Sequence, residues 1–144
     1  MNKLVLRTLL PALAAIVLWL VICFPHPRPV LAQNDAVQVI EVTAKKYEYS
    51  PDPIHVKSGS KIQLKITAAD HDHGFSISTV ADDSNSNGSE GLVLISPQEC
   101  WQLKKGETTT IEFVAQTPGT YSFKCCHVCG LGHRGMKGQL VVDR

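Results

Sequence analysis

Residues 119–136 read GTYSFKCCHVCGLGHRGM, and they join a short alternating stretch to a loop rich in metal-binding side chains. Tyr121, Phe123 and Cys125 alternate with polar residues, which is the period of a half-buried β-strand. The twelve residues from Cys125 onward hold three of the five cysteines, two of the six histidines and the only methionine other than Met1. This stretch predicts a strand that runs into a metal site.

The donors in this loop favour copper. Thiolate, imidazole and thioether together are soft ligands that select copper over hard cations, and a thioether is a poor ligand for zinc. They follow the spacing Cys-x3-Cys-x3-His-x2-Met over residues 125–136, with three glycines that allow tight turns. A further ligand must come from elsewhere in the fold, and residues 70–75, DHDHGF, offer His71 and His73.

The same two-residue period recurs through residues 33–144. No segment there has a convincing helical period, and proline- or glycine-containing turns separate the alternating stretches. Several short strands at this spacing predict an all-β domain, either a sandwich or a small barrel. The apolar members of these stretches are Val37 and Val39; Ile62, Leu64 and Ile66; Phe75 and Ile77; Ile111 and Phe113; and Leu140 and Val142.

Three pieces of this sequence together resemble a known family. They are residues 73–77 (HGFSI), residues 119–125 (GTYSFKC) and the Cys-x3-Cys-x3-His-x2-Met run. They are similar to the cupredoxin domain of cytochrome c oxidase subunit II and to the related domain of nitrous oxide reductase. The resemblance covers most of residues 36–144 and is strongest over 104–142. It implies a cupredoxin-like Greek-key β-sandwich with a dinuclear Cu(A) copper centre.

The resemblance also implies a role for each ligand. Cys125 and Cys129 would be bridging thiolates, and His73 and His133 would be terminal ligands, one on each copper. Met136 would be a weak axial ligand of one copper, and the backbone carbonyl of His127 would bind the other. The metal site expected here therefore comprises His73, Cys125, His127, Cys129, His133 and Met136.

Some features differ from the family pattern and leave alternatives open. Oxidase members usually have glutamate where this chain has His127, so its imidazole is an alternative ligand to its carbonyl. Cys126 is an additional thiol that alternation turns away from the site, and it is expected either to pair with Cys100 or to stay free. A mononuclear copper site is the alternative to the dinuclear one.

The first 32 residues form a separate segment with the order of an export signal. Lys3 and Arg7 precede the uncharged apolar run of residues 8–24, and a proline-rich stretch then leads to Ala32. The run is long for a signal peptide and short for a membrane span. We expect residues 1–32 to be a cleaved signal peptide or an N-terminal membrane anchor helix with a proline-rich linker. Residues 33–144 would then be an exported, periplasmic cupredoxin domain.

The charge of the chain is unevenly distributed along the sequence. The formal net charge of +1 is the sum of a basic segment, residues 1–32, and a charge of −2 on residues 33–144. The sequence has no cluster of basic residues that would suit nucleic-acid binding.

The predicted function is one-electron transfer through copper, as an electron-transfer protein or oxidase subunit, with a c-type cytochrome or terminal oxidase as redox partner. The alternatives are an exported copper-handling protein and a binding module stabilised by zinc or disulfides.

Overall fold

Ten β-strands and one 3₁₀ turn make up the part of the chain that a computed structural model describes, residues 37–82 and 88–144. The strands are β1 (Val37–Lys45), β2 (Glu48–Ser50), β3 (Ile54–Lys57), β4 (Lys61–Ala68), β5 (His73–Ile77), β6 (Leu92–Leu94), β7 (Trp101–Leu103), β8 (Thr108–Ala115), β9 (Gly119–Lys124) and β10 (Lys137–Asp143). The 3₁₀ turn η1 (His133–Gly135) lies between β9 and β10.

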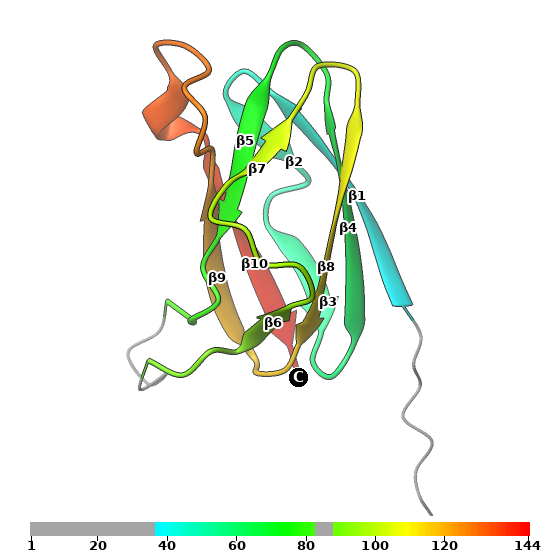
Figure 1. Cartoon of the computed structure of the whole chain (residues 1–144). Helices are drawn as coiled ribbons and strands as arrows, with labels where there is room; N and C mark the ends of the chain where they lie inside the picture. The colour runs from blue at the N-terminus through cyan, green and yellow to red at the C-terminus, as the bar shows by residue number, and fades with distance from the viewer. Residues whose placement is uncertain (1–36, 83–87) are drawn as a thin grey trace, which may run out of the picture. The chain divides into compact units, whose positions relative to one another are not determined.

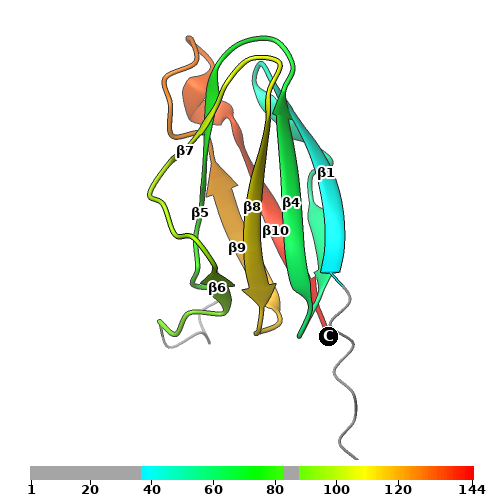
Figure 2. The same cartoon turned by 45° about the vertical axis from the view of Figure 1, so that its right-hand side comes forward.

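The strands form two five-stranded sheets that lie one against the other (Figure 1, Figure 2). One sheet has the order β2-β1-β4-β8-β6 and the other has the order β3-β10-β9-β5-β7. The all-β sandwich predicted from the sequence is confirmed. The helix expected over residues 8–24, and the boundary expected between residues 32 and 33, lie outside the described residues. No helix within residues 37–82 and 88–144 is long and apolar enough to cross a membrane.

Alternation in the strands creates the core. In β4, Ile62, Leu64 and Ile66 are fully buried while Lys61 on the other face is exposed. The facing sheet contributes aromatic side chains, among them Tyr121 and Phe123 of β9. Because each strand buries one face against the other sheet, the free energy of folding comes mainly from this shared apolar layer.

The pairing of β5 leaves room for the loop after β9. β5 pairs with β7 over His73–Phe75, but it pairs with β9 only at Ser76 and Ile77. β9 ends at Lys124, opposite Ser76. Beyond this point the chain leaves the sheet beside the first half of β5, so residues after Lys124 are placed next to His73 and Gly74.

Candidate metal centre

The cysteine-rich segment between β9 and β10, residues 125–136, is called the ligand loop below. Its two ends are tied together, because the Cys125 N–H donates to the Met136 carbonyl at 2.9 Å. Inside the loop the His133 N–H donates to the Gly130 carbonyl, and the Met136 N–H donates to the His133 carbonyl, both at 3.1 Å. These bonds close the loop into a compact turn that directs several side chains to one point.

Four of the six predicted ligands meet at that point. The Cys125 and Cys129 Sγ atoms are 3.6 Å apart. Cys129 Sγ also lies 3.8 Å from His133 Nδ1 and 3.8 Å from Met136 Sδ. Both thiols and the thioether are buried, and His133 is half-buried. The spacing read from the sequence therefore corresponds to a true cluster of soft donors.

His73 approaches the same cluster from β5. It is fully buried, and its Nε2 lies 2.7 Å from Asp70 Oδ1, so it is the ring nitrogen that donates to the carboxylate. Its Nδ1 is buried without a hydrogen-bond partner among the described residues. A lone pair is then free on Nδ1, which is the form of imidazole that binds a metal. His73, His71 and Cys129 bring donor atoms within 4.8 Å of one another.

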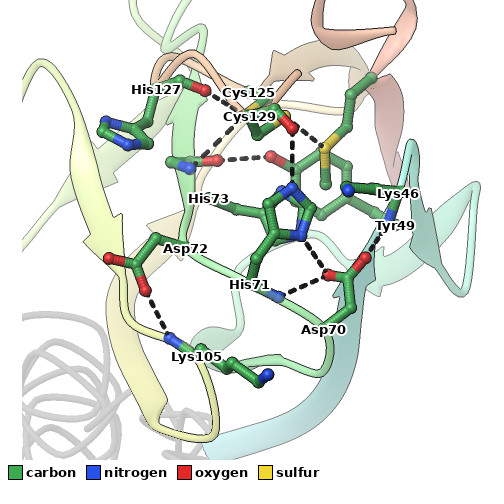
Figure 3. A network of polar contacts seen from close by, with 12 residues as sticks. Lys46, Tyr49, Asp70, His71, Asp72, His73, Lys105, Cys125, His127 and Cys129 are labelled. Atoms are coloured by element: carbon green, nitrogen blue, oxygen red, sulfur yellow. Dashed lines mark hydrogen bonds and ion pairs between the residues drawn. The ribbon is translucent and has the colours of Figure 1, made fainter. Parts of the chain in front are cut away.

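His127 presents its backbone to the site and its ring to the surface. Its carbonyl oxygen accepts the Cys125 thiol proton at 3.1 Å, while the side chain is exposed and turned away from the cysteines (Figure 3). In this arrangement the carbonyl, and not the imidazole, is the group of His127 that is near the thiols.

Two residues outside the predicted ligand set hold the site from the β4–β5 connection. His71 Nε2 contacts the Cys129 carbonyl at 2.7 Å, and its ring packs against that of His73 at 4.2 Å. His71 Nδ1 is also 2.8 Å from Asp70 Oδ1, at an angle poor for a hydrogen bond. Partial burial opposes ionisation of Asp70, but hydrogen bonds from His73 and from backbone N–H groups hold the pKa of its carboxyl well below its usual range.

Asp70 is therefore tied into the site by several hydrogen bonds and is not simply a solvated loop residue. Asp70 accepts hydrogen bonds from the Lys46 and His71 N–H groups, both at 2.9 Å, in addition to that from His73. The signal available in the sequence was the spacing of three residues between an acidic side chain and a candidate ligand histidine. A carboxylate behind a ligand imidazole commonly fixes its tautomer and orientation.

Tyr49 is a further residue that the sequence did not indicate. Its hydroxyl donates to the Gly74 carbonyl at 2.5 Å, and its ring lies edge-on to Phe75 and Phe123. Burial, and then the neighbouring thiols of Cys125 and Cys129, raise the pKa of Tyr49 far above its usual value. The hydroxyl therefore stays protonated and acts as a donor beside the cysteines.

Glycines let other segments approach the ligand loop closely. A Cβ on Gly74 would come 2.7 Å from the His127 backbone nitrogen and 2.8 Å from Cys126 Sγ. A Cβ on Gly132 would meet the ring of Tyr47 at 2.2 Å. The Gly74 N–H also points at Cys125 Sγ, 3.5 Å away. β5 and the β1–β2 turn thus hold the ligand loop from two sides.

A disulfide joins Cys126 to Cys100, which confirms the pairing considered in the sequence. It links the ligand loop to the segment just before β7, and it leaves Cys125 and Cys129 as the free cysteines of the described residues.

Removing this bond should destabilise the domain. The cross-link closes a loop of 26 residues. The doubly substituted chain, Cys100→Ser with Cys126→Ser, should lose about 3.5 kcal/mol of unfolding free energy, because its unfolded state regains the entropy of that loop. Urea unfolding of the metal-free protein measures the change. An unfolding free energy equal to that of the wild type would contradict it.

The Cys129 thiol is protonated when no metal is bound. Burial, reinforced by the adjacent Cys125 thiol, raises the pKa of Cys129 to about 11. A metal that binds here must therefore displace a proton, so binding weakens as the pH falls. This is the expected behaviour of a buried thiol in a metal site.

Comparison with known proteins identifies the family. The family description of a cupredoxin-like domain matches residues 12–142. The chain belongs to the cupredoxin-like family. It is also 35% identical over 103 residues to cytochrome c oxidase subunit 2 of Thermus thermophilus, a match that covers 72% of this chain and 64% of that protein. A second sequence of that subunit, from a particular strain of the same species, matches at the same identity over 51% of its length. This cupredoxin therefore spans about half to two thirds of these relatives.

Solved structures support the fold at lower identity. The periplasmic domain of cytochrome oxidase subunit II from Bradyrhizobium japonicum is 16% identical with a TM-score of 0.57, covering 74% of this chain and 84% of that one. Reduced auracyanin from Roseiflexus castenholzii is 23% identical with a TM-score of 0.54, covering 74% and 98%. At these identities the likeness concerns the fold alone.

The residues present fit copper. Membership of the cupredoxin-like family, relatedness to oxidase subunit 2 and a buried His/Cys/Met cluster together support copper binding by this chain. The unpartnered Nδ1 of His73 is a structural sign of the same fit, because a buried imidazole nitrogen normally has a partner.

Proposed function

We propose that this cupredoxin transfers single electrons through a Cu(A)-like dinuclear copper centre, in a role similar to that of cytochrome c oxidase subunit II. The ligands would be His73, Cys125, Cys129, His133 and Met136, with the carbonyl of His127 as a sixth donor. Copper at such a site alternates between two oxidation states and so accepts and releases one electron at a time.

One observation carries the proposal of two metal ions. The described residues contain two groups able to hold a metal, one of His71, His73 and Cys129 and one of Cys125, Cys129 and His133. In the first group His73 is the proposed ligand, because His71 Nε2 already contacts the Cys129 carbonyl. The groups share Cys129, and the two thiols are 3.6 Å apart. A shared thiol between two sets of donors is the arrangement that bridging requires.

The chain's own residues prepare the site for fast electron transfer. One sheet, packed against the other, holds β5, β9 and β10 and with them the positions of the ligands, so that a change of charge moves few atoms. Asp70 orients His73, the Gly74 N–H faces Cys125, and Tyr49 keeps a protonated hydroxyl beside the thiols. Hydrogen bonds around the ligands, together with burial, tune the reduction potential of a metal site.

The location and partners belong to the same proposal. Residues 33–144 would lie outside the cytoplasm, delivered or anchored by the apolar run of residues 8–24. Electrons would come from a c-type cytochrome or pass to a terminal oxidase, with the chain as a subunit or a separate carrier. The Thermus relatives named above motivate this assignment.

Copper handling is the alternative from another class. Cys126 and His127 would favour it if they were spare ligands, because spare ligands assist exchange of copper between sites. Cys126 is occupied by the disulfide to Cys100. His127 remains as an exposed imidazole, and this is a weaker reason for copper exchange.

Reversible redox cycling tests the proposed function. The full chain, loaded with copper in detergent, should take up and release one electron per centre over many cycles of an electrode potential without losing metal. Loss of copper from the protein on reduction would instead support the copper-handling alternative. Stoichiometric zinc in natively purified protein would support the third alternative, a binding module stabilised by zinc.

Substitution of Asp70 should weaken copper binding without abolishing it. In Asp70→Asn the carboxylate that orients His73 is replaced by an amide, and outer-sphere changes of this kind reduce metal affinity about 10–100-fold. Competition with a copper chelator measures the affinity. Asp72→Asn is the matched control, because Asp72 pairs with exposed Lys104 at 2.8 Å. Equal losses in the two variants would argue against the role of Asp70.

A further inference from the structure

Four connections meet at the end of the sandwich that carries the metal centre (Figure 1, Figure 2). They are the β1–β2, β4–β5, β7–β8 and β9–β10 connections, taken with the strand residue on either side, and they are called the metal end below. The end holds seven basic residues, Lys45, Lys46, Lys104, Lys105, Lys124, Arg134 and Lys137. It holds four acidic residues, Glu48, Asp70, Asp72 and Glu107.

The charge of the described domain is therefore segregated. The metal end has a formal charge of +3, whereas the other described residues have four basic and seven acidic side chains and a charge of −3. The mild negative charge of residues 33–144 as a whole hides this division. Two copper ions carry at least as much positive charge as two thiolates carry negative charge, so a dinuclear centre would not reverse the sign of this end.

Most of the acidic groups at the metal end are already engaged. Glu48 pairs with Lys45 at 3.0 Å, and Asp72 pairs with Lys104. Asp70 faces inward to His71 and His73. Among the described residues no ion pair involves the basic side chains that remain, which are Lys46, Lys105, Lys124, Arg134 and Lys137. All five are exposed.

The metal end also has exposed apolar side chains and a hollow that two of these cations line. Val128 and Leu131 of the ligand loop are 77% and 105% exposed, so they project fully into solvent. A hollow of about 450 Å³ is lined by Lys124, Cys125, Cys126, His133, Arg134 and Met136. It brings the surface directly over three candidate ligands, Cys125, His133 and Met136, and two cations line it. Exposed apolar side chains together with charged ones are typical of a transient protein interface.

We infer that the metal end is a docking surface for a redox protein whose own surface around its cofactor is acidic. This inference rests on the proposed function and specifies the chemistry of the partner. Opposite charge steers the encounter, while Val128 and Leu131 exclude water from the contact. An electron must leave through the surface nearest the metal, so the sign of this end, and not the net charge of the domain, selects the partner.

The wild-type chain provides the first test. Its reduced copper form donates one electron to hexacyanoferrate(III), an anion, or to tris(phenanthroline)cobalt(III), a cation. Between about 10 mM and about 0.5 M salt, where screening becomes nearly complete, the rate with the anion should fall about tenfold. The rate with the cation should not fall. A strongly acidic c-type cytochrome should likewise react faster at low salt than a strongly basic one. The opposite order would overturn the inference.

Charge reversal separates the local charge from the net charge. Lys105→Glu, Lys124→Glu and Arg134→Glu together should abolish the salt-dependent advantage of the anion. Lys57→Glu, Lys61→Glu and Arg144→Glu change the net charge equally at the far end of the strands and should preserve it. Equal losses in both variants would overturn the inference. Copper content and spectrum are recorded for each protein, because their absence in the wild type would instead contradict the proposed function.

Discussion

Replacement of Cys129 by serine should reduce copper binding nearly to zero. Cys129 belongs to both groups of candidate ligands, and its Sγ is within 3.8 Å of a second thiol, an imidazole and a thioether. A serine hydroxyl is a hard, neutral donor and does not replace a bridging thiolate. Each of the two sets of donors would therefore lose the ligand that it shares with the other. Metal analysis after copper loading and dialysis measures the effect.

The adjacent disulfide supplies the control for this result. Cys100→Ser combined with Cys126→Ser also removes sulfur from the ligand loop, but the Cys126 sulfur is bonded to Cys100 and is not one of the clustered donors. This pair of substitutions should leave the amount of bound copper equal to that of the wild type, measured under conditions in which the destabilised protein is still folded. The assignment of ligands fails if the pair loses copper while Cys129→Ser retains it.

Gly74→Ala should disturb the site from the opposite side. The new Cβ would lie 2.7 Å from a backbone nitrogen of the ligand loop, and backbone moves less easily than the end of a side chain. Overpacking at such a contact should cost about 2 kcal/mol of unfolding free energy. The shift should also separate Cys125 from His73 and weaken copper binding. Urea unfolding and chelator competition measure the two effects.

Gly135→Ala is the matched control within the ligand loop itself. A Cβ there would have no atom within 4 Å, and Gly135 is not among the glycines with positive φ. Its stability should equal or slightly exceed that of the wild type, because alanine restricts the unfolded chain more than glycine does. If both glycine variants behave alike, close approach at Gly74 is not what positions the loop.

The long strands were predictable because alternation persists in them. β4 and β8 have eight residues each. β4 buries every second side chain and β8 does so from Ile111 onward, so a period of two is clear in both. The short strands β2, β3, β6 and β7 have only three or four residues, too few for a period to stand out. They exist because neighbouring strands pair with them, which is a property of the whole fold.

The ligand set was predictable for a similar reason, since most of it is local. Cys125, Cys129, His133 and Met136 lie in one loop, so their spacing alone indicates a cluster. His71, Tyr49 and Gly74 act through contacts with residues 25 to 58 positions away. Such contacts depend on how β5 and the β4–β5 connection lie against the ligand loop. No periodicity or spacing in the sequence reports that packing.

The electron paramagnetic resonance spectrum of the copper-loaded full chain tests the central proposal most directly. One unpaired electron shared by two equivalent copper ions gives hyperfine structure from both nuclei, and we expect that pattern together with two copper ions per chain. A four-line spectrum with one copper ion per chain would contradict the dinuclear centre and leave a mononuclear cupredoxin.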